Sequence, residues 1–132
     1  MLTITAVVGS VLALIYIRLA FNVINLRQKH RVSLGAGDRP DLEKAIRAHG
    51  NFAEYVPIAL ILLAVLEYNR GALWMLGVCG LLLVLGRGLH AYGMVQEGKG
   101  VSAWRVRGMV LTITAIIGLA VGNLWVVIRG VM

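Results

Sequence analysis

Four long stretches of this sequence contain no charged residue, and they constrain the fold more than any other feature. They cover residues 1–17, 55–66, 71–86 and 108–128. A helix of about 20 predominantly apolar residues crosses the ~30 Å hydrocarbon core of a bilayer. The composition agrees, because 59% of the residues are hydrophobic and only 14% are charged, which is unusual for a soluble domain. We therefore predict an integral membrane protein with four spans.

The spans are expected to be helices, because lipid offers no hydrogen-bonding partner to an open strand and the alternating pattern of a barrel strand is missing. The run 55–66 is too short to cross alone, so its helix must continue into the polar residues before it. The expected helices cover about residues 3–29, 41–68, 73–94 and 103–129, with Asp41 as a plausible N-cap of the second. The predicted fold class is all-α: one domain, residues 1–132, forming a four-helix bundle with up-down topology.

A net charge of +7 would suggest a nucleic-acid partner in a soluble protein, but here the basic residues orient the chain instead. Arg70 alone lies between spans two and three, and Arg129 alone follows span four. The other basic residues fall mainly between spans one and two or between spans three and four: Arg27, Lys29, Arg31, Arg39, Lys44, Arg47, Lys99, Arg105 and Arg107. The positive-inside rule then places both basic loops in the cytoplasm and both termini outside. No nucleic-acid partner is expected.

A polar stripe lies where the second helix enters the membrane. Arg47, Asn51 and Glu54 are spaced i, i+4 and i+7, so they share one helix face. Further polar residues lie at the cytoplasmic ends of the other helices: Arg27, Arg31, Arg87, His90, Tyr92, Arg105 and Arg107. Near lipid, such groups must pair with one another, face the bundle interior or line a wet cavity. The stripe therefore predicts a pocket for a small anion, although an ion-pair network with only a packing role explains Arg47 and Glu54 equally well.

The pocket would suit a ligand that carries both carboxylates and an ammonium. Glu54 would receive the ammonium, while arginines would hold the carboxylates. The lone Cys79 lies in an apolar run, and no Cys/His set has metal-ligand spacing, so no metal site is expected.

The run LEKAIRAHGNFAEYVPIALIL, residues 42–62, resembles the signature of the MAPEG family, the membrane-associated proteins in eicosanoid and glutathione metabolism. The second helix of that family typically reads E-R-x-x-R-A-x-x-N-x-x-E-x-x-P. The matching residues are Glu43, Arg47, Ala48, Asn51, Glu54 and Pro57. The four spans, LRQKHRVSLG, GRGLHAYG and the arginines that open helix four extend the resemblance over the whole chain. It looks closest to the short bacterial inner-membrane branch.

This resemblance implies a homotrimer that binds glutathione between neighbouring subunits at the cytoplasmic side. The positions implied for binding are Arg27, Arg31, Arg47, His49, Asn51, Glu54, Tyr55, Arg87 and His90, with Tyr92 as a partial match to the tyrosines of helix three. An arginine at the start of helix four stabilises the glutathione thiolate in the family. Arg105 and Arg107 both fit that catalytic role.

The function expected from the resemblance is a membrane-bound, glutathione-dependent transferase or peroxidase. Glutathione would be the cosubstrate, and its thiolate, the nucleophilic form, would attack a lipophilic small molecule that enters from the membrane lipid. An alternative is a non-catalytic protein of the same fold that binds glutathione or lipid, suggested by Gln28, where the leukotriene synthase branch has the second of two arginines. A small exporter is less favoured, because the acidic residues lie near the ends of the spans.

Overall fold

The computed structural model describes residues 1–96 and 102–131, and Lys99 of the second basic loop lies outside these ranges. The helices are α1 (Thr3–His30), α2 (Pro40–Tyr68), α3 (Leu73–Gln96) and α4 (Ala103–Val131). All four are long and apolar enough to cross a membrane, and the described ranges contain no strand. The prediction of an all-helical chain with four membrane-spanning helices is confirmed.

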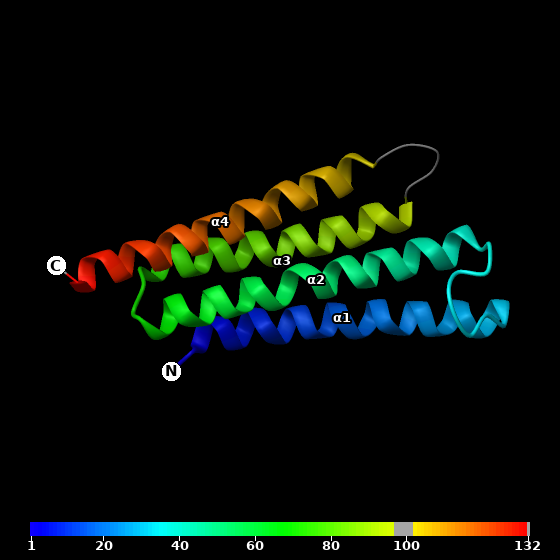
Figure 1. The fold of residues 1–132 in the computed structure, drawn as a ribbon, viewed down its shortest axis with the longest axis horizontal. Coiled ribbons are helices and arrows are strands. Elements are labelled where there is room, and N and C mark those ends of the chain that lie inside the picture. The colour runs from blue at the N-terminus through cyan, green and yellow to red at the C-terminus, as the bar shows by residue number, and fades with distance from the viewer. Residues whose placement is uncertain (97–101, 132) are drawn as a thin grey trace.

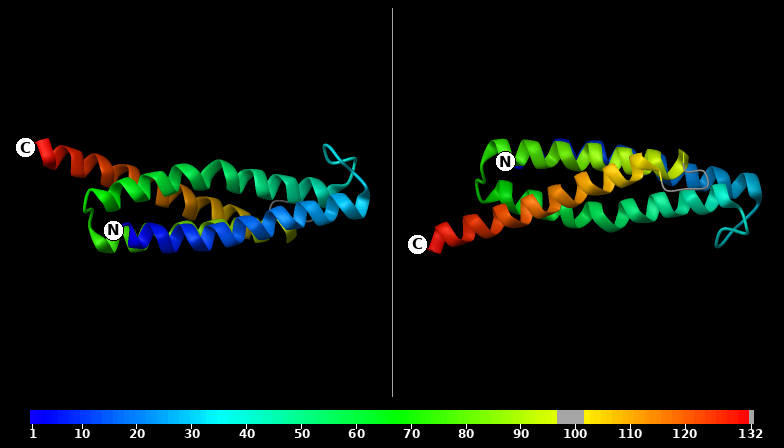
Figure 2. Two further views of the ribbon diagram at one scale, coloured as in Figure 1. Left: turned by 90° about the horizontal axis from the view of Figure 1, so that it is seen from below. Right: turned by 90° about the horizontal axis from the view of Figure 1, so that it is seen from above.

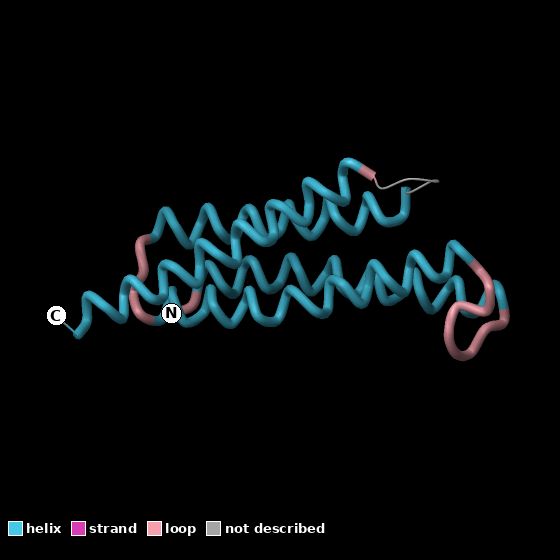
Figure 3. The backbone as a smooth tube through the Cα atoms, turned by 45° about the horizontal axis from the view of Figure 1, so that its top comes forward, coloured by secondary structure: helices cyan, strands magenta, loops and turns pink. Residues whose placement is uncertain are grey.

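The helices pack as an elongated bundle in which α1 contacts α2 and α3, and α4 contacts α3 and α2. In the part of the chain that the structure describes, α1 and α4 do not pack closely against each other. The loop between α1 and α2 lies at the opposite end of the bundle from both termini and from the turn between α2 and α3 (Figures 1 and 3). The C-terminal end of α4 diverges from the other three helices (Figure 2).

The outer surface of the bundle is apolar, as expected for helices in lipid. Large exposed side chains occur on every helix, including Phe21, Ile61, Leu81 and Ile117. The buried core is built largely from leucine and alanine, and it contains few polar side chains. A buried charged residue in this setting therefore calls for specific partners.

Glycines bring α3 and α4 close together. A Cβ added at Gly86 would lie 2.7 Å from Oγ1 of Thr112 and 2.9 Å from the carbonyl oxygen of Gly108. Such distances are too short for a real side chain, so the close approach requires glycine at this position. In contrast, a Cβ at Gly77 or Gly88, on the same helix, would meet no atom within 4 Å. The close contact places Thr112 of α4 directly beside α3.

Glu67, near the end of α2, holds the first turn of α1. Its carboxylate accepts hydrogen bonds from the backbone N–H groups of Ile4, at 2.8 Å, and Thr5, at 2.7 Å, and from the Thr5 hydroxyl at 2.7 Å. The first amides of a helix have no acceptor within the helix and carry partial positive charge. The Glu67 carboxylate gives these amides both an acceptor and a negative charge. It also fixes the start of α1 against the end of α2.

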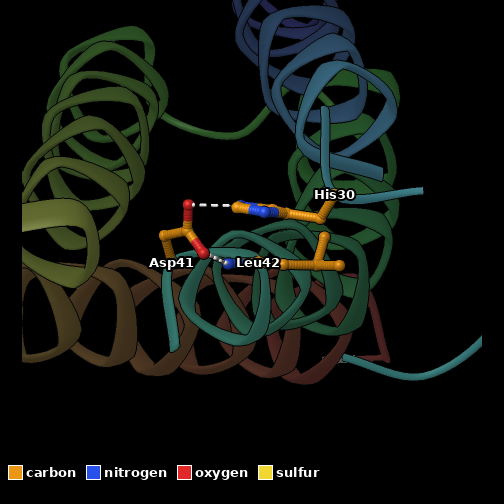
Figure 4. Close-up of polar contacts among 3 residues, drawn as sticks. All are labelled: His30, Asp41 and Leu42. Carbon is orange, nitrogen blue, oxygen red and sulfur yellow. Dashed lines mark hydrogen bonds and ion pairs between the residues drawn. The ribbon is translucent and has the colours of Figure 1, made fainter. Parts of the chain in front are cut away.

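A second polar contact joins α1 and α2 at the other end of the bundle. Oδ2 of Asp41 lies 2.8 Å from Nε2 of His30, and Oδ1 of Asp41 accepts a 2.9 Å bond from the N–H of Leu42 (Figure 4). The prediction that Asp41 is the N-cap is wrong, because α2 begins at Pro40 and Arg39 is the N-cap. Proline suits a first turn since its missing N–H would be unpaired there anyway. The contact fixes the start of the helix that carries the polar stripe.

Candidate functional site

The side chain of Arg87 on α3 lies at the centre of a polar cluster between three helices, with none of its surface exposed. Its Nε donates a 2.9 Å hydrogen bond to Oγ1 of Thr112 on α4. Its Nη1 donates to Oδ1 of Asn51 on α2 at 2.9 Å, and more weakly to the Asn51 carbonyl oxygen at 3.4 Å. The Thr112 hydroxyl in turn donates to the carbonyl oxygen of Gly108 at 2.8 Å. Arg87 therefore ties α2, α3 and α4 together.

The guanidinium of Arg87 is not fully satisfied by these bonds. Its Nη2 is buried without a hydrogen-bond partner among the described residues. The ring of Tyr55 lies 5.2 Å from the guanidinium carbon, at a distance where an aromatic face attracts a cation. A buried charged donor that lacks an acceptor is costly. Nη2 of Arg87 is therefore available to an acceptor that lies outside the described residues.

Arg87 also sets the orientation of the Asn51 amide. Arginine has donors and no acceptor, so the amide atom that faces it must be the oxygen. The Asn51 Nδ2 group consequently points away from Arg87 and remains a donor. Asn51 is half-buried, which leaves this donor at the edge of the cluster, where it can meet an acceptor such as a carboxylate.

Arg47 and Glu54 lie on the outside of α2, on either side of Asn51 along the stripe, and both side chains are exposed. Neither forms a hydrogen bond or ion pair with the other or with any other residue in the described ranges. Gly50 lies between them, and the space where its Cβ would be is open. The packing-only explanation needs an ion pair of Arg47 or Glu54, and the described residues contain none. The stripe instead presents a cation and an anion to whatever lies beside α2.

The two histidines of the predicted site lie on different sides of the bundle. His90, one turn beyond Arg87 on α3, is 3% exposed, and its backbone lies against Gly108 of α4. His49 packs its ring on Tyr16 of α1, with the ring centroids 4.7 Å apart. The Nε2 of His49 is buried without a partner among the described residues. His49 thus lies on the α1 side of α2, whereas His90 lies on the α4 side of α3.

The two arginines considered for the thiolate differ in position. Arg105 is half-buried, and a Cβ at Gly93 of α3 would collide with its backbone. Since Arg105 precedes Thr112 by seven residues, both lie on the face of α4 that packs on α3. Arg107 is exposed, and its guanidinium carbon lies 5.4 Å from the ring of Trp104. The geometry favours Arg105 as the arginine on the Arg87 side of α4.

Three other residues of the predicted site lie apart from Arg87. Arg27 donates from Nη1 to the carbonyl oxygens of Ser33 and Gly35, both at 3.1 Å, and to that of Val32 at 3.4 Å, so its guanidinium holds the loop after α1. Arg31 is exposed and forms the left-handed C-cap of α1, with φ of 55°. Tyr92 is exposed and lines a groove between α1 and α3. The contacts of these three residues do not include the Arg87 cluster.

Sequence reasoning missed Thr112, which accepts the bond from Arg87. The available signal was a hydroxyl in a long apolar run, four residues after Gly108 and therefore on the same helix face. Threonines in helices commonly donate to a carbonyl one turn earlier, so this residue alone did not indicate a role. Within residues 1–96 and 102–131, no three His, Cys, Asp or Glu side chains come close enough to hold a metal ion.

Known proteins match this chain over nearly its whole length. The model of the MAPEG family matches residues 5–125. The inner membrane protein YecN of Escherichia coli strain K12 is 39% identical over 113 residues, which cover 86% of this chain and 84% of that protein. YecN of strain O6:H1 matches with the same identity and coverage. The polar stripe of α2 and the Arg87 cluster both lie inside the matched segment.

Proposed function

Since this chain belongs to the MAPEG family, we propose that it binds glutathione on the polar stripe of α2 and uses the thiolate to conjugate or reduce lipophilic electrophiles. It is an integral membrane protein. The name of its Escherichia coli relatives supports the inner membrane as its location. Arg47 and Glu54 are exposed and have no partner among the described residues, and this observation carries the proposal.

The chemistry of the stripe fits glutathione, which has two carboxylates, one ammonium and one thiol. Arg47 offers a planar guanidinium for a carboxylate, and Glu54, about two turns further along, offers an anion for the ammonium. The Asn51 amide, held by Arg87, supplies a donor between them. Because Arg87 fixes that amide before any ligand arrives, little side-chain entropy is lost on binding.

The same exposure supports a homotrimer in which a second subunit closes the site. A cation and an anion on the outer face of a spanning helix would be costly if they faced acyl chains. A neighbouring subunit would cover them and enclose the ligand. The proposed topology is up-down, with both termini outside and the site on the cytoplasmic side, where the positive-inside rule places the basic loops.

In the proposed mechanism, Arg105 stabilises the thiolate of bound glutathione. A free thiol has a pKa of ~8.5, and a neighbouring guanidinium in a site with little water favours the anion. The thiolate then attacks a substrate that reaches the site through the bilayer. At an electrophilic carbon it forms a thioether and displaces the leaving group. At a hydroperoxide it breaks the O–O bond and releases the alcohol, and a second glutathione converts the resulting sulfenic acid into the disulfide and water. The apolar outer faces of the helices suit such a substrate.

Turnover tests this proposal. Purified protein in detergent is incubated with glutathione and, in separate reactions, with an aryl halide and a lipid hydroperoxide, and the loss of thiol is followed. We expect thiol consumption with at least one substrate and a loss of at least tenfold in Glu54→Gln. Glu43→Gln is the matched control, because Glu43 is also exposed on α2 but lies in its first turn. If the wild-type protein consumes no thiol with either substrate, the proposed enzymatic activity is ruled out.

One observation favours a non-catalytic alternative, in which the protein binds glutathione without turnover. The Nη1 group of Arg27, a residue expected to contact the ligand, donates to the carbonyl oxygens of Val32, Ser33 and Gly35. One expected ligand contact is therefore already used within the chain. Binding of glutathione without thiol consumption would select this alternative.

A further inference from the structure

Arg18 of α1 is a cation inside a membrane-spanning helix, and the proposed function does not use it. It is the only charged residue among the first 26 residues, in a helix that is long and apolar enough to cross a membrane. Its side chain is exposed, and it forms no hydrogen bond or ion pair with any residue that the structure describes. An arginine at such a position normally faces an anion or a wet cavity.

The depth of Arg18 follows from the length of α1. The helix has 28 residues, so it is about 42 Å long, whereas the hydrocarbon core is about 30 Å thick. Arg18 precedes His30 at the end of the helix by about 18 Å at 1.5 Å per residue. Even if the whole excess length projected beyond the membrane at that end, its Cα would lie about 6 Å inside the hydrocarbon. Its side chain must therefore extend toward the headgroups of that leaflet.

Arg18 lines a groove of about 740 Å³ on the outside of the bundle, between α1 and α3. Deeper in the membrane the α1 wall is apolar, with Leu14 and Ile17, and toward the loop end it carries Asn22 and Asn25. The α3 wall changes in the same direction, from Gly88 and Ala91 to Tyr92 and Gln96. None of the described residues that line the groove is acidic. The groove is thus apolar at its deeper end and polar toward the loop end, as a lipid is from its acyl chains to its headgroup.

A second cavity, of about 570 Å³, adjoins the groove at its polar end. The two share Asn22 and Val95, and the second is lined by Asp41 and Lys44 at the start of α2. There is consequently polar space beyond Arg18, toward the loop end of the bundle, for a headgroup larger than a phosphate.

We propose that the groove between α1 and α3 binds a phospholipid with an anionic headgroup, whose phosphate pairs with Arg18. The amides of Asn22 and Asn25 and the hydroxyl of Tyr92 supply further donors around the phosphate. An acyl chain lies along Leu14 and Ile17, and the headgroup extends into the adjoining cavity. The groove is unsuited to glutathione, because its described lining has no carboxylate to receive the ammonium and Asp41 of the adjoining cavity is already paired with His30. The proposal does not depend on the thiol site.

Lipid retention measured by native mass spectrometry tests the proposal. Protein in mild detergent is titrated with phosphatidylglycerol, phosphatidylcholine or diacylglycerol that carry the same acyl chains. We expect phosphatidylglycerol to be retained about fivefold more strongly than phosphatidylcholine, because one basic group near an anionic lipid contributes about that factor. Diacylglycerol, which lacks the phosphate, is expected to bind least.

Matched variants locate the site. Arg18→Gln should abolish the preference for phosphatidylglycerol, whereas Arg39→Gln, which removes an exposed arginine outside the groove, should retain it. Gly88→Leu should fill the groove and lower retention, while Gly77→Leu should not. Both glycines are on α3 with open space around the Cβ position, so neither change disturbs the packing, and thermal midpoints in detergent verify this.

Three outcomes would overturn the proposal. The first is equal retention of phosphatidylglycerol and phosphatidylcholine by the wild type. The second is indistinguishable behaviour of Gly88→Leu and Gly77→Leu. The third is a change in oligomeric state in Gly88→Leu with unchanged lipid retention, which would mean that another copy of the chain covers the groove.

Discussion

Arg87 of α3 and Asn51 of α2 are joined by a 2.9 Å hydrogen bond from Nη1 to Oδ1, inside the bundle and one turn from the exposed Glu54. This contact connects the buried framework of the protein with the surface proposed to bind its ligand. It holds the amide so that Nδ2 faces away from Arg87, and it anchors α2 to α3 at the level of the polar stripe. Ligand binding by the stripe is therefore expected to depend on Arg87, which is fully buried.

Replacing Arg87 by methionine should destabilise the protein strongly. The change leaves the Asn51 oxygen without its donor and removes the link to Thr112, and hydrogen bonds to charged groups contribute about 1.5–3 kcal/mol. Thermal unfolding in detergent, followed by circular dichroism, measures the loss. The double variant Arg87→Met/Asn51→Leu should lose less stability than the two single variants lose in sum, since the two residues are coupled. Additive losses would show that the bond contributes nothing.

Gly86→Ala should destabilise the contact between α3 and α4. The added Cβ would lie 2.7 Å from Oγ1 of Thr112, and forced overpacking of this kind costs about 1–3 kcal/mol. Gly88→Ala, two residues away, is the matched control, because its Cβ meets open space and alanine favours a helix over glycine by up to about 1 kcal/mol. Unfolding midpoints should fall in the first variant and stay or rise in the second. Equal midpoints would contradict the close packing.

Glu67→Gln should loosen the start of α1. The neutral amide keeps one acceptor but loses the charge that favours the helix N-terminus, an effect of about 0.3–1 kcal/mol. Hydrogen exchange at the amides of Ile4 and Thr5, which donate to Glu67, should become faster. Exchange near the polar stripe of α2 should not change. Unchanged protection of the two amides would mean that the carboxylate does not hold this turn.

Arg105→Ala should abolish formation of the glutathione thiolate, whereas Arg107→Ala should retain it. Arg105 lies on the face of α4 that packs on α3, while Arg107 is exposed and lies over Trp104. Stopped-flow ultraviolet absorbance detects the thiolate when glutathione is mixed with protein. Retention of the signal in Arg105→Ala would contradict the role given to that residue, and loss in Arg107→Ala alone would reverse the assignment.

The sequence was sufficient to predict the membrane-spanning helices, because their apolar runs leave no other stable arrangement in lipid. It was also sufficient to place Arg47, Asn51 and Glu54 on one face, since helical spacing is regular. It did not predict that Asn51 would face Arg87 while Arg47 and Glu54 face outward. That division depends on how α2 is rotated against α3 and α4, and the hydrogen bonds from Arg87 to Asn51 fix it. The role of Arg27 was equally hidden, because its partners are backbone carbonyls in a loop.

The proposed site itself is tested most directly by calorimetry of glutathione binding to the purified protein in detergent. Saturable heat is expected for the wild type, and Arg47→Gln and Glu54→Gln should each weaken binding about tenfold or more, as expected for the loss of a charged hydrogen bond. Glu43→Gln should bind as the wild type does. No saturable binding to the wild type, or equal affinity in all three variants, would contradict the assignment of the α2 stripe as a glutathione site.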